Sequence, residues 1–419
     1  MTKSADSLAV ESATDAKAGR NERPSLLLLP FPPTPTTRTL LSAAYRPSLA
    51  AALTKLRNPQ GAEKLVIAVA CPILHGQHLR SKSVLWPEAQ ALLAGIYTLL
   101  SVVCAELKIG VEVDGGPGSV DATVIPLDHD RKRHFLSESQ PAIKTNSTIV
   151  VDLATFALAY HPWKSIFHVR SEPGLELFNA YIKLAEGRQT LLQSQLVPVE
   201  GGLALNATQE SPPTHSPPTT GYSVVCLGGT FDYLHPGHKL LLTAAALLLQ
   251  VPDAHPSRPC QFIIGVTGDE LLKNKKYAEY VQPWAARARN VILFLSRLLR
   301  VSEKGWKDGP LLDIDEQDGD FRASFRDSAI TVQCVRIHDA FGPTVTVQDM
   351  DALVVSGETR SGGRAVNDRR AEKGWRCLEI FEVDVLDAGE ITDEAGAPES
   401  FASKISSTAI RQQRARNIT

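Results

Sequence analysis

The chain has 419 residues, of which 43% are hydrophobic and 21% are charged, and its formal net charge at pH 7 is −2. This length allows two or three domains, each with a sizeable hydrophobic core. A net charge near zero gives no electrostatic case for a general nucleic-acid-binding protein or for a membrane-surface protein. The longest apolar stretch, residues 91–105, is shorter than the roughly 18 to 20 residues of a membrane span. We therefore expect no nucleic-acid partner, no membrane partner, and a buried helix over 91–105.

The cysteine pattern indicates a reducing compartment. Six cysteines are spread singly along the chain, mostly in apolar runs, and none forms a C-x-x-C pair. Such cysteines are typical of reduced, buried thiols, so the expected localisation is cytoplasmic. The first 24 residues carry four acidic side chains and no apolar core, which fits neither a signal peptide nor an Arg-rich transit peptide. A disordered tail is expected over residues 1–24.

Strand and helix signals alternate over residues 25–200, which predicts a separate N-terminal α/β domain of unknown role. The strands are expected at 65–69 and 148–152, and the helices at 88–107 and 175–192. A proline-rich stretch then predicts an exposed linker over residues 201–220. Residues 221–419 form the second predicted domain, with a core of its own. Its segment 302–327 is dense in Asp, Lys, Gly and Arg and is predicted to be a surface insertion.

An apolar run that breaks into glycines is the most informative feature of the second domain. Residues 222–227 have the pattern of a buried strand, and residues 239–249 form an apolar block of helical length. Between them, Gly228 and Gly229 lack a Cβ, so the backbone can turn sharply and bring its N–H groups close to an anion. Pro236 suits the first turn of a helix, whose N-terminus favours the same anion. The spacing predicts a phosphate-binding turn.

Two histidines, His235 and His238, add side-chain donors at this turn. As ordinary loop histidines they would need no ligand, but histidine, glycine and proline all stand where a phosphate site needs them. Two histidines three residues apart can also begin a zinc site. No cysteine or further histidine lies close enough in sequence to complete a tetrahedral set, so no protein-bound metal is predicted.

A hydroxyl cluster near the C-terminus, formed by Ser406, Ser407 and Thr408, precedes a run of helix-forming residues. Such hydroxyls suit a helix N-cap, and together with the first N–H groups of the helix they can also bind a phosphate. Arg411 lies four residues after Ser407 and therefore on the same helix face, from which its guanidinium can reach the same oxygens. Alone, this pattern is also that of an ordinary capped terminal helix.

Two loops follow predicted strands of the second domain. Strand 351–356 leads into loop 357–363, and strand 261–266 leads into a run that contains Lys273, Lys275 and Lys276. Ligands of open α/β sheets bind at the carboxyl ends of such strands. Taken alone, a residue such as Glu358 is more often a solvated loop acid, and the lysine run is equally well explained as a solvated face. The position of the run also allows one lysine to serve as a point charge for a second phosphorylated substrate.

These segments resemble the motifs of a known superfamily. Residues 228–238 read G-G-T-F-D-Y-L-H-P-G-H and residues 405–411 read I-S-S-T-A-I-R, and both resemble signature motifs of the nucleotidylyltransferases. Residues 354–367 contain V-V-S-G-E-T, then G-G and V-N, as in the phosphopantetheine adenylyltransferases of eukaryotes and archaea. Residues 265–276 also resemble that family. Four ordered motifs over residues 222–419 make the resemblance specific.

The resemblance implies a Rossmann-like domain, with a parallel sheet and flanking helices, over residues 221–419. It also implies transfer of AMP from ATP to 4′-phosphopantetheine, which gives dephospho-coenzyme A and pyrophosphate in a late step of coenzyme A biosynthesis. ATP and 4′-phosphopantetheine are therefore the expected partners, and association with other coenzyme A pathway enzymes is left open. Mg²⁺ is expected on the triphosphate, held mainly by phosphate oxygens and water.

The resemblance also implies roles for individual residues. The two histidines would donate to the phosphates at the reacting centre, and the arginine with its neighbouring hydroxyls would hold the β- and γ-phosphates. The family has a substrate-binding lysine in the loop after strand 261–266, for which we choose Lys273 and Lys276. The implied catalytic set is His235, His238, Lys273, Lys276 and Arg411. The implied nucleotide-binding set is Gly228, Gly229, Thr230, Phe231, Gly357, Glu358, Thr359, Ser406, Ser407 and Thr408.

Three other functions share the first motif or the fold. A cytidylyltransferase for a phospho-alcohol is expected to show an R-T-x-G-I-S-T segment, which this sequence lacks. A nicotinamide mononucleotide adenylyltransferase often shares the I-S-S-T-x-I-R motif but differs around residues 357–367. A catalytically inactive nucleotide-binding scaffold is the non-enzyme alternative, and the intact His235, His238 and Arg411 speak against it.

Overall fold

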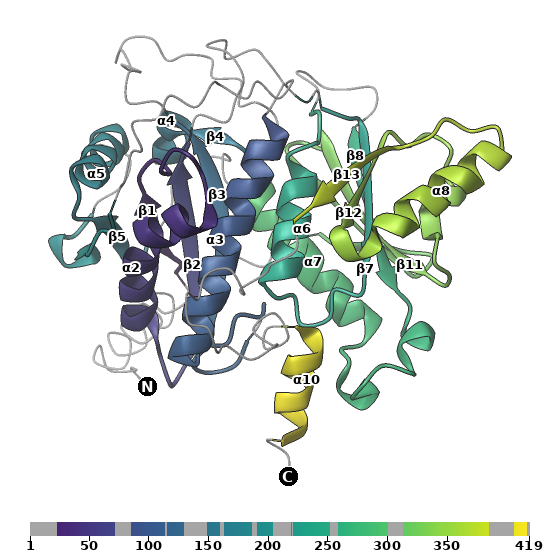
Figure 1. The fold of residues 1–419 in the computed structure, drawn as a ribbon, viewed down its shortest axis with the longest axis horizontal. Helices are drawn as coiled ribbons and strands as arrows, with labels where there is room; N and C mark the ends of the chain where they lie inside the picture. Colours follow the sequence, from purple (N-terminus) through teal and green to yellow (C-terminus); the bar gives the residue numbers. More distant parts are fainter. Residues whose placement is uncertain are drawn as a thin grey trace, which may run out of the picture.

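Two β-sheets with helices packed against them make up the chain (Figure 1). The computed structural model describes residues 23–71, 85–113, 115–129, 149–159, 163–186, 191–203, 219, 221–251, 259–300, 313–384 and 406–416. Most of the predicted tail at 1–24 and most of the predicted linker at 201–220 lie outside these described residues.

The N-terminal half forms a six-stranded sheet in the order β4-β3-β2-β1-β5-β6, and every neighbouring pair is parallel. All five residues of β1 are buried, as expected of a parallel sheet that is covered on both faces. Its strands are β1 (Ser25–Leu29), β2 (Glu63–Ala70), β3 (Val120–Asp128), β4 (Val151–Asp152), β5 (Ile166–Val169) and β6 (Leu196–Val199). Its helices are α2 (Arg38–Leu56), α3 (Trp86–Leu107), α4 (Leu153–Leu158) and α5 (Glu172–Ala185).

The C-terminal half forms a seven-stranded sheet in the order β13-β12-β7-β8-β11-β10-β9. The five strands from β13 to β11 are parallel to their neighbours. The strands are β7 (Val224–Gly229), β8 (Cys260–Thr267), β9 (Asp315–Gln317), β10 (Asp320–Phe325), β11 (Ile330–Ile337), β12 (Ala352–Ser356) and β13 (Glu379–Val383). The helices are α6 (Pro236–Ala246), α7 (Trp284–Leu299), α8 (Arg360–Glu372) and α10 (Ser407–Arg416). The predicted α/β class, a Rossmann-like domain after a separate N-terminal α/β domain, is confirmed.

Alternate residues of β7 face opposite sides of the C-terminal sheet, as a strand period of two requires. Val225 and Leu227 belong to the large core that contains the buried residues of α6 and α7. Cys226 belongs to a smaller core with Val366 of α8. Helices therefore cover both faces, and the strand ends remain as the edge at which a ligand can bind.

The segment 302–327 differs from the surface insertion that its composition predicts. Residues 301–312 lie outside the described part of the chain, but β9 and β10 continue the sheet as an antiparallel extension of β11. Phe321, Ala323 and Phe325 of β10 are buried, whereas Arg322 and Ser324 between them are exposed. This alternation of buried and exposed residues is typical of a strand. The prediction missed it because it was based on the charged composition of the whole segment.

Helix α3 joins the two halves, and Figure 1 shows it beside α6. It is the predicted buried helix. By length and composition it is apolar enough to cross a membrane, but 78% of its most apolar window is buried inside the protein. The indole N–H of Trp86 donates to the carbonyl oxygen of Ala244 on α6 (2.9 Å). The rings of Trp86 and Phe381 on β13 pack edge to face, with their centroids 5.1 Å apart. Buried side chains of both halves form one contiguous cluster, so the two halves share a packed interface.

Candidate functional site

The carboxyl ends of three neighbouring strands bring the predicted segments together. In the sheet, β12, β7 and β8 are adjacent and parallel, so their ends lie along one edge. The chain runs from β7 outward to β8 and β11 and then returns to β12 on the other side of β7. The boundary between β7 and β12 is therefore the switch point at which open α/β sheets bind ligands. The turn after β7, the lysine loop after β8 and the short helix η5 (Gly357–Thr359) after β12 all start at this edge.

The turn after β7 has an uncommon backbone conformation. Phe231 and Tyr233 have φ angles of 53° and 46°, in the left-handed region that residues other than glycine rarely adopt. Phe231 is fully buried, while the N–H of Tyr233 donates to Gln282 Oε1 (2.8 Å) and its hydroxyl to the carbonyl oxygen of Tyr280 (2.6 Å). A Cβ on Gly229 would lie 2.9 Å from the Phe231 ring, so this position requires glycine. Packing and the loop after β8 thus hold a strained turn in place.

His235 and His238 stand together at the start of α6. His235 is the residue before the helix, His238 lies in its first turn, and their rings stack with centroids 4.0 Å apart. Burial, together with the charge of Lys239, lowers the pKa of His235 to about 4. Burial also lowers the pKa of His238 well below its usual value, with contributions from His235 and Lys275. Both imidazoles are therefore neutral at pH 7.

Each neutral imidazole carries one N–H, and the surroundings indicate on which nitrogen. The Nδ1 atoms of both rings are buried and have no hydrogen-bond partner among the described residues. A proton on Nδ1 would make a buried donor without an acceptor, which costs about 1–3 kcal/mol, so we assign the proton to Nε2. Nε2 is thus the atom through which each ring can donate to a ligand.

A buried ion pair joins this turn to α10. Arg411 Nη1 lies 2.6 Å from Asp232 Oδ2, and the two side chains are 2% and 0% exposed. Arg411 also donates from Nη2 to Thr408 Oγ1 (3.0 Å) and from Nε to the carbonyl oxygen of Lys276 (3.1 Å). The Ser407 hydroxyl donates to the carbonyl oxygen of Asp232 (2.9 Å). The predicted arginine and hydroxyls therefore meet the first motif, although Arg411 and Asp232 are 179 residues apart in sequence.

Through these contacts, Arg411 connects the C-terminal motif to the glycine-histidine motif after β7. Three of the five N–H donors of its guanidinium are bonded to acceptors of the protein itself. Ser406 Oγ accepts from the N–H of Ala409 (3.3 Å), as an N-cap hydroxyl does. Direct contacts of Arg411, Ser407 and Thr408 with the β- and γ-phosphates of a nucleotide stay a prediction.

Known proteins match the part of the chain that carries both motifs. Residues 226–413, which span both motifs, match a family model described as cytidylyltransferase-like. The phosphopantetheine adenylyltransferase of Pyrococcus abyssi is 30% identical over 190 residues, which cover 45% of this chain and 89% of that protein. This chain belongs to the nucleotidylyltransferase superfamily.

Relatives of the nucleotidylyltransferase domain occur in fungi and archaea. The phosphopantetheine adenylyltransferase of Saccharomyces cerevisiae is 34% identical over 191 residues, which are 46% of this chain and 48% of the yeast protein. The matched region thus spans about half the length of the yeast relative. The phosphopantetheine adenylyltransferase of Methanothermobacter thermautotrophicus is 31% identical over 191 residues, 84% of its length. Residues 12–205 match a family model described as a domain of unknown function.

Arg287 of α7 holds the nucleotidylyltransferase site together and was not among the predicted residues. Its side chain is fully buried and donates to the carbonyl oxygens of Thr230 (2.7 Å), Thr267 (2.8 Å) and Gln282 (2.8 Å). It also donates to Asp269 Oδ1 (2.6 Å). One guanidinium therefore fixes the turn after β7 and the loop after β8 relative to each other. The sequence signal was an arginine within the apolar face of a helix, which indicates a buried network of acceptors.

The lysine loop lies at the same edge of the nucleotidylyltransferase sheet. Lys273 and Lys276, the two lysines chosen from the sequence, are exposed, and so is Lys275 between them. The main chain of Lys276 is held by Arg411. Among the three, Lys275 is the lysine whose charge lowers the pKa of His238, so its ammonium acts on the histidine pair. Lys275 was not among the lysines chosen from the sequence.

The loop after β12 stands across the switch point from the histidines. Gly357, Glu358 and Thr359 form η5, in which Thr359 Oγ1 accepts from the N–H of Ser356 (3.1 Å). The Glu358 side chain is exposed. The next residue, Arg360, begins α8 and makes paired 2.5 Å hydrogen bonds to the carboxylate of Glu382 on β13. The contacts of this loop with adenine and ribose stay a prediction.

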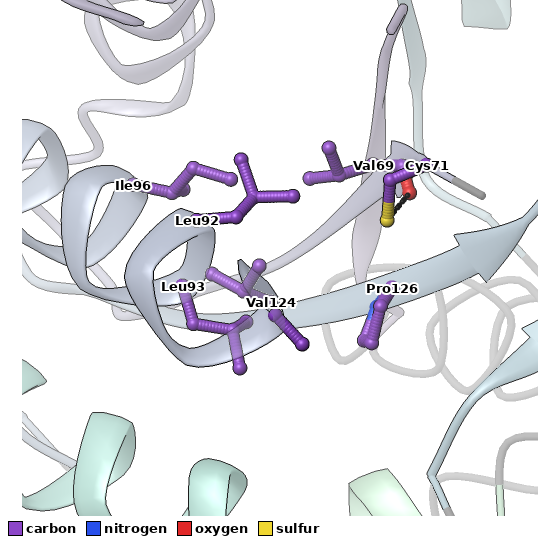
Figure 2. A pocket seen from close by; sticks show the side chains of 8 residues that line it. Val69, Cys71, Leu92, Leu93, Ile96, Val124 and Pro126 are labelled. Carbon is purple, nitrogen blue, oxygen red and sulfur yellow. Dashed lines mark hydrogen bonds between the residues drawn. The ribbon is translucent and has the colours of Figure 1, made fainter. Parts of the chain in front are cut away.

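An open pocket of about 510 Å³ lies in the N-terminal half, lined by residues that include Arg57, Glu63 and Lys164. No group of three or more His, Cys, Asp or Glu side chains among the described residues can hold a metal ion. A small apolar cavity lies in the N-terminal half, between α3 and the strands β2 and β3 (Figure 2). Its space is about 10 Å³, and it is lined by Val69, Cys71, Ala89, Leu92, Leu93, Ile96, Val124 and Pro126. A space of that size holds one water at most, so it is a packing gap.

Proposed function

We propose that this chain transfers AMP from ATP to 4′-phosphopantetheine, with dephospho-coenzyme A and pyrophosphate as products. The observation that carries the proposal is the meeting of two motifs at one sheet edge. A pair of neutral imidazoles follows β7, and a hydroxyl-capped helix is tied to the same turn through Asp232 and Arg411. The names of the yeast and archaeal relatives support the choice of acceptor substrate.

The reaction needs positioning more than proton transfer. The attacking group is a phosphate monoester with a second pKa of about 6, so it is mostly a dianion at pH 7. One of its oxygens attacks the α-phosphorus of ATP, the bond from that phosphorus to the bridging oxygen of the β-phosphate breaks, and pyrophosphate leaves with the electron pair. No general base is required. The site has to hold two anions in line and stabilise charge on the α-phosphate and the pyrophosphate.

The residues at the sheet edge suit this task. In the proposed complex, His235 and His238 donate from Nε2 to the reacting phosphates, and their low pKa keeps them neutral donors. The lysine loop supplies positive charge for the second substrate, and Lys275 joins Lys273 and Lys276 as a candidate. Mg²⁺ would be held by the ATP phosphates and water and would supply further neutralisation.

The nucleoside end of ATP is proposed to lie over the β7–β12 boundary. Gly228 and Gly229 let the phosphates approach the backbone, and Thr230 orients the transferred phosphate. Glu358 accepts from the ribose hydroxyls, and the backbone of η5 contacts adenine. We propose that the reaction takes place in the cytoplasm, and the six free cysteines, five of them buried, support a reducing compartment.

The test measures pyrophosphate release by the full chain with three substrate pairs. These are ATP with phosphopantetheine, ATP with nicotinamide mononucleotide, and CTP with phosphocholine. Release is expected with the first pair alone, together with dephospho-coenzyme A in the mass spectrum, and His238→Ala serves as the matched low-activity control. Release with the second or third pair alone would replace the proposal by the corresponding alternative. ATP binding without release from any pair would indicate a nucleotide-binding scaffold.

A further inference from the structure

Lys239 directly follows His238 but points away from the histidines, into the N-terminal half. Its ammonium lies 2.6 Å from Asp121 Oδ1 and donates to the carbonyl oxygens of Val111 (3.2 Å) and Ala122 (3.1 Å). The Lys239 side chain is 1% exposed. All three of its N–H donors are therefore used by the N-terminal half. The first turn of α6, which carries His238, is anchored to a different sheet from the one it covers.

Asp121 holds two helices of the nucleotidylyltransferase domain at once. Its second carboxylate oxygen, Oδ2, accepts from Arg297 Nη1 on α7. Burial acts to raise the pKa of Asp121, but Arg297 and Lys239 outweigh it and lower the pKa, so the carboxylate is ionised. Buried charges of this kind contribute little net stability because desolvation offsets their attraction. Their effect here is geometric, since one carboxylate on β3 sets the positions of α6 and α7.

The loop between α3 and β3 also reaches the second motif. Glu112 Oε1 lies 3.5 Å from Arg414 Nη2 on α10, and Glu112 Oε2 accepts from the N–H of Val111 (3.0 Å). Arg414 lies one helical turn after Arg411, and its guanidinium covers the Tyr233 ring at 4.5 Å. The loop that binds Lys239 through the Val111 carbonyl therefore also contacts the helix that carries the hydroxyl cluster.

We propose that Asp121 and Glu112 of the N-terminal half are positioning residues for the nucleotide site, acting through Lys239 on His238 and through Arg414 on α10. This inference rests on the proposed adenylyltransfer at that site. It gives the N-terminal half a role that its match to a domain of unknown function leaves open. A displacement of about 1 Å at a reacting centre costs on the order of 10² in rate, so a small tilt of α6 is enough to matter.

The inference predicts that the two contacts affect different kinetic constants. His238 faces the reacting phosphate, so loosening α6 should lower kcat and leave the KM for ATP within about threefold. The hydroxyls of α10 are proposed to hold the triphosphate, so loosening Glu112 should weaken ATP binding and leave kcat nearly unchanged. A purely structural role of the interface would lower the stability in both cases without this division.

The experiment compares full-length variants. Lys239→Met removes the anchor of α6 and leaves Asp121 paired with Arg297, and it should lower kcat by about ten- to a hundredfold. Lys164→Met is the control, because it breaks a lysine–carboxylate pair of the same 2.6 Å length within the N-terminal half, between the partly exposed Lys164 (31%) and the buried Glu63. This control should lose stability and keep kcat. If Lys239→Met keeps kcat within twofold of the parent, the role of Asp121 is refuted.

The second arm measures ATP affinity directly by calorimetry, which does not depend on turnover. Glu112→Gln should weaken ATP binding by two- to fivefold, the range expected for a partly exposed ion pair. The double variant Glu112→Gln/Arg414→Met should match Arg414→Met alone if Glu112 acts through Arg414. Parent-like affinity of Glu112→Gln would overturn this half of the inference, and this measurement can be made even if Lys239→Met does not fold. If the parent binds ATP but forms no dephospho-coenzyme A, the proposed function fails and the calorimetric arm still applies.

Discussion

Replacing Arg411 by methionine should strongly destabilise the protein. Methionine fills much of the space of the arginine stem but leaves Asp232 Oδ2 without its partner at 2.6 Å, in a fully buried position. Removing one member of a buried ion pair costs about 3–5 kcal/mol, against a typical total stability of about 5–15 kcal/mol. The N–H of Gln282 still donates to Asp232 Oδ1 at 2.9 Å and offsets only part of this loss.

A second variant separates the structural role of Arg411 from a role in nucleotide binding. Arg411→Met combined with Asp232→Asn removes both charges and keeps an amide oxygen for the N–H of Gln282. This double variant should regain most of the lost stability because no unpaired buried charge remains. If Arg411 also holds the β- and γ-phosphates, ATP affinity stays low in the double variant even though the fold has recovered.

The assay is urea unfolding of the full chain, followed by the fluorescence of its five tryptophans, with ATP binding measured by calorimetry at pH 7. The two halves share one core, so a single unfolding transition is expected. An Arg411→Met variant that unfolds at the urea midpoint of the parent refutes this prediction. The prediction is also refuted if the double variant is no more stable than the single one.

Further predictions concern the histidines, the lysine loop and the N-terminal half. His238→Ala should lower kcat by about 10² to 10³ in steady-state assays, because it removes a preorganised donor, and a rate within threefold of the parent would contradict this. His235 should make the free energy of unfolding fall by about 1 kcal/mol per pH unit as the pH is lowered from about 6.5 to about 4, because its imidazole binds a proton in the unfolded chain but not in the folded one. His235→Gln should flatten the plot of urea midpoint against pH in this range. An unchanged slope of that plot would speak against the prediction. Lys275→Ala should raise the KM for phosphopantetheine more than Lys273→Ala does, and equal effects would remove the distinction. Residues 221–419 expressed alone should unfold at a lower temperature than the full chain, because α6 and α7 lose their buried partners, and an unchanged midpoint would refute this.

Local chemistry could be predicted from the sequence because it lies in contiguous segments. The strand that ends in Gly228 and Gly229, the helix that begins at Pro236 and the histidines between them need only the spacing of eleven residues to be recognised. The strands at 261–266 and 351–356 were predicted within one residue of β8 and β12, since buried parallel strands are apolar at nearly every position. The charged β10 was missed because only every second residue of it is buried.

The tertiary structure decided which of these segments meet and what each charged side chain contacts. Asp232 and Arg411 pair across 179 residues, and Arg287 bonds to carbonyl oxygens that no residue pattern identifies. A lysine that follows the second histidine of a phosphate-binding turn would be expected to contact phosphate. Lys239 turns away instead, because the N-terminal half buries it and supplies Asp121 and two carbonyl oxygens for its three donors. The sequence determined the chemistry of the turn, and the packing of the two halves determined the direction in which its charges point.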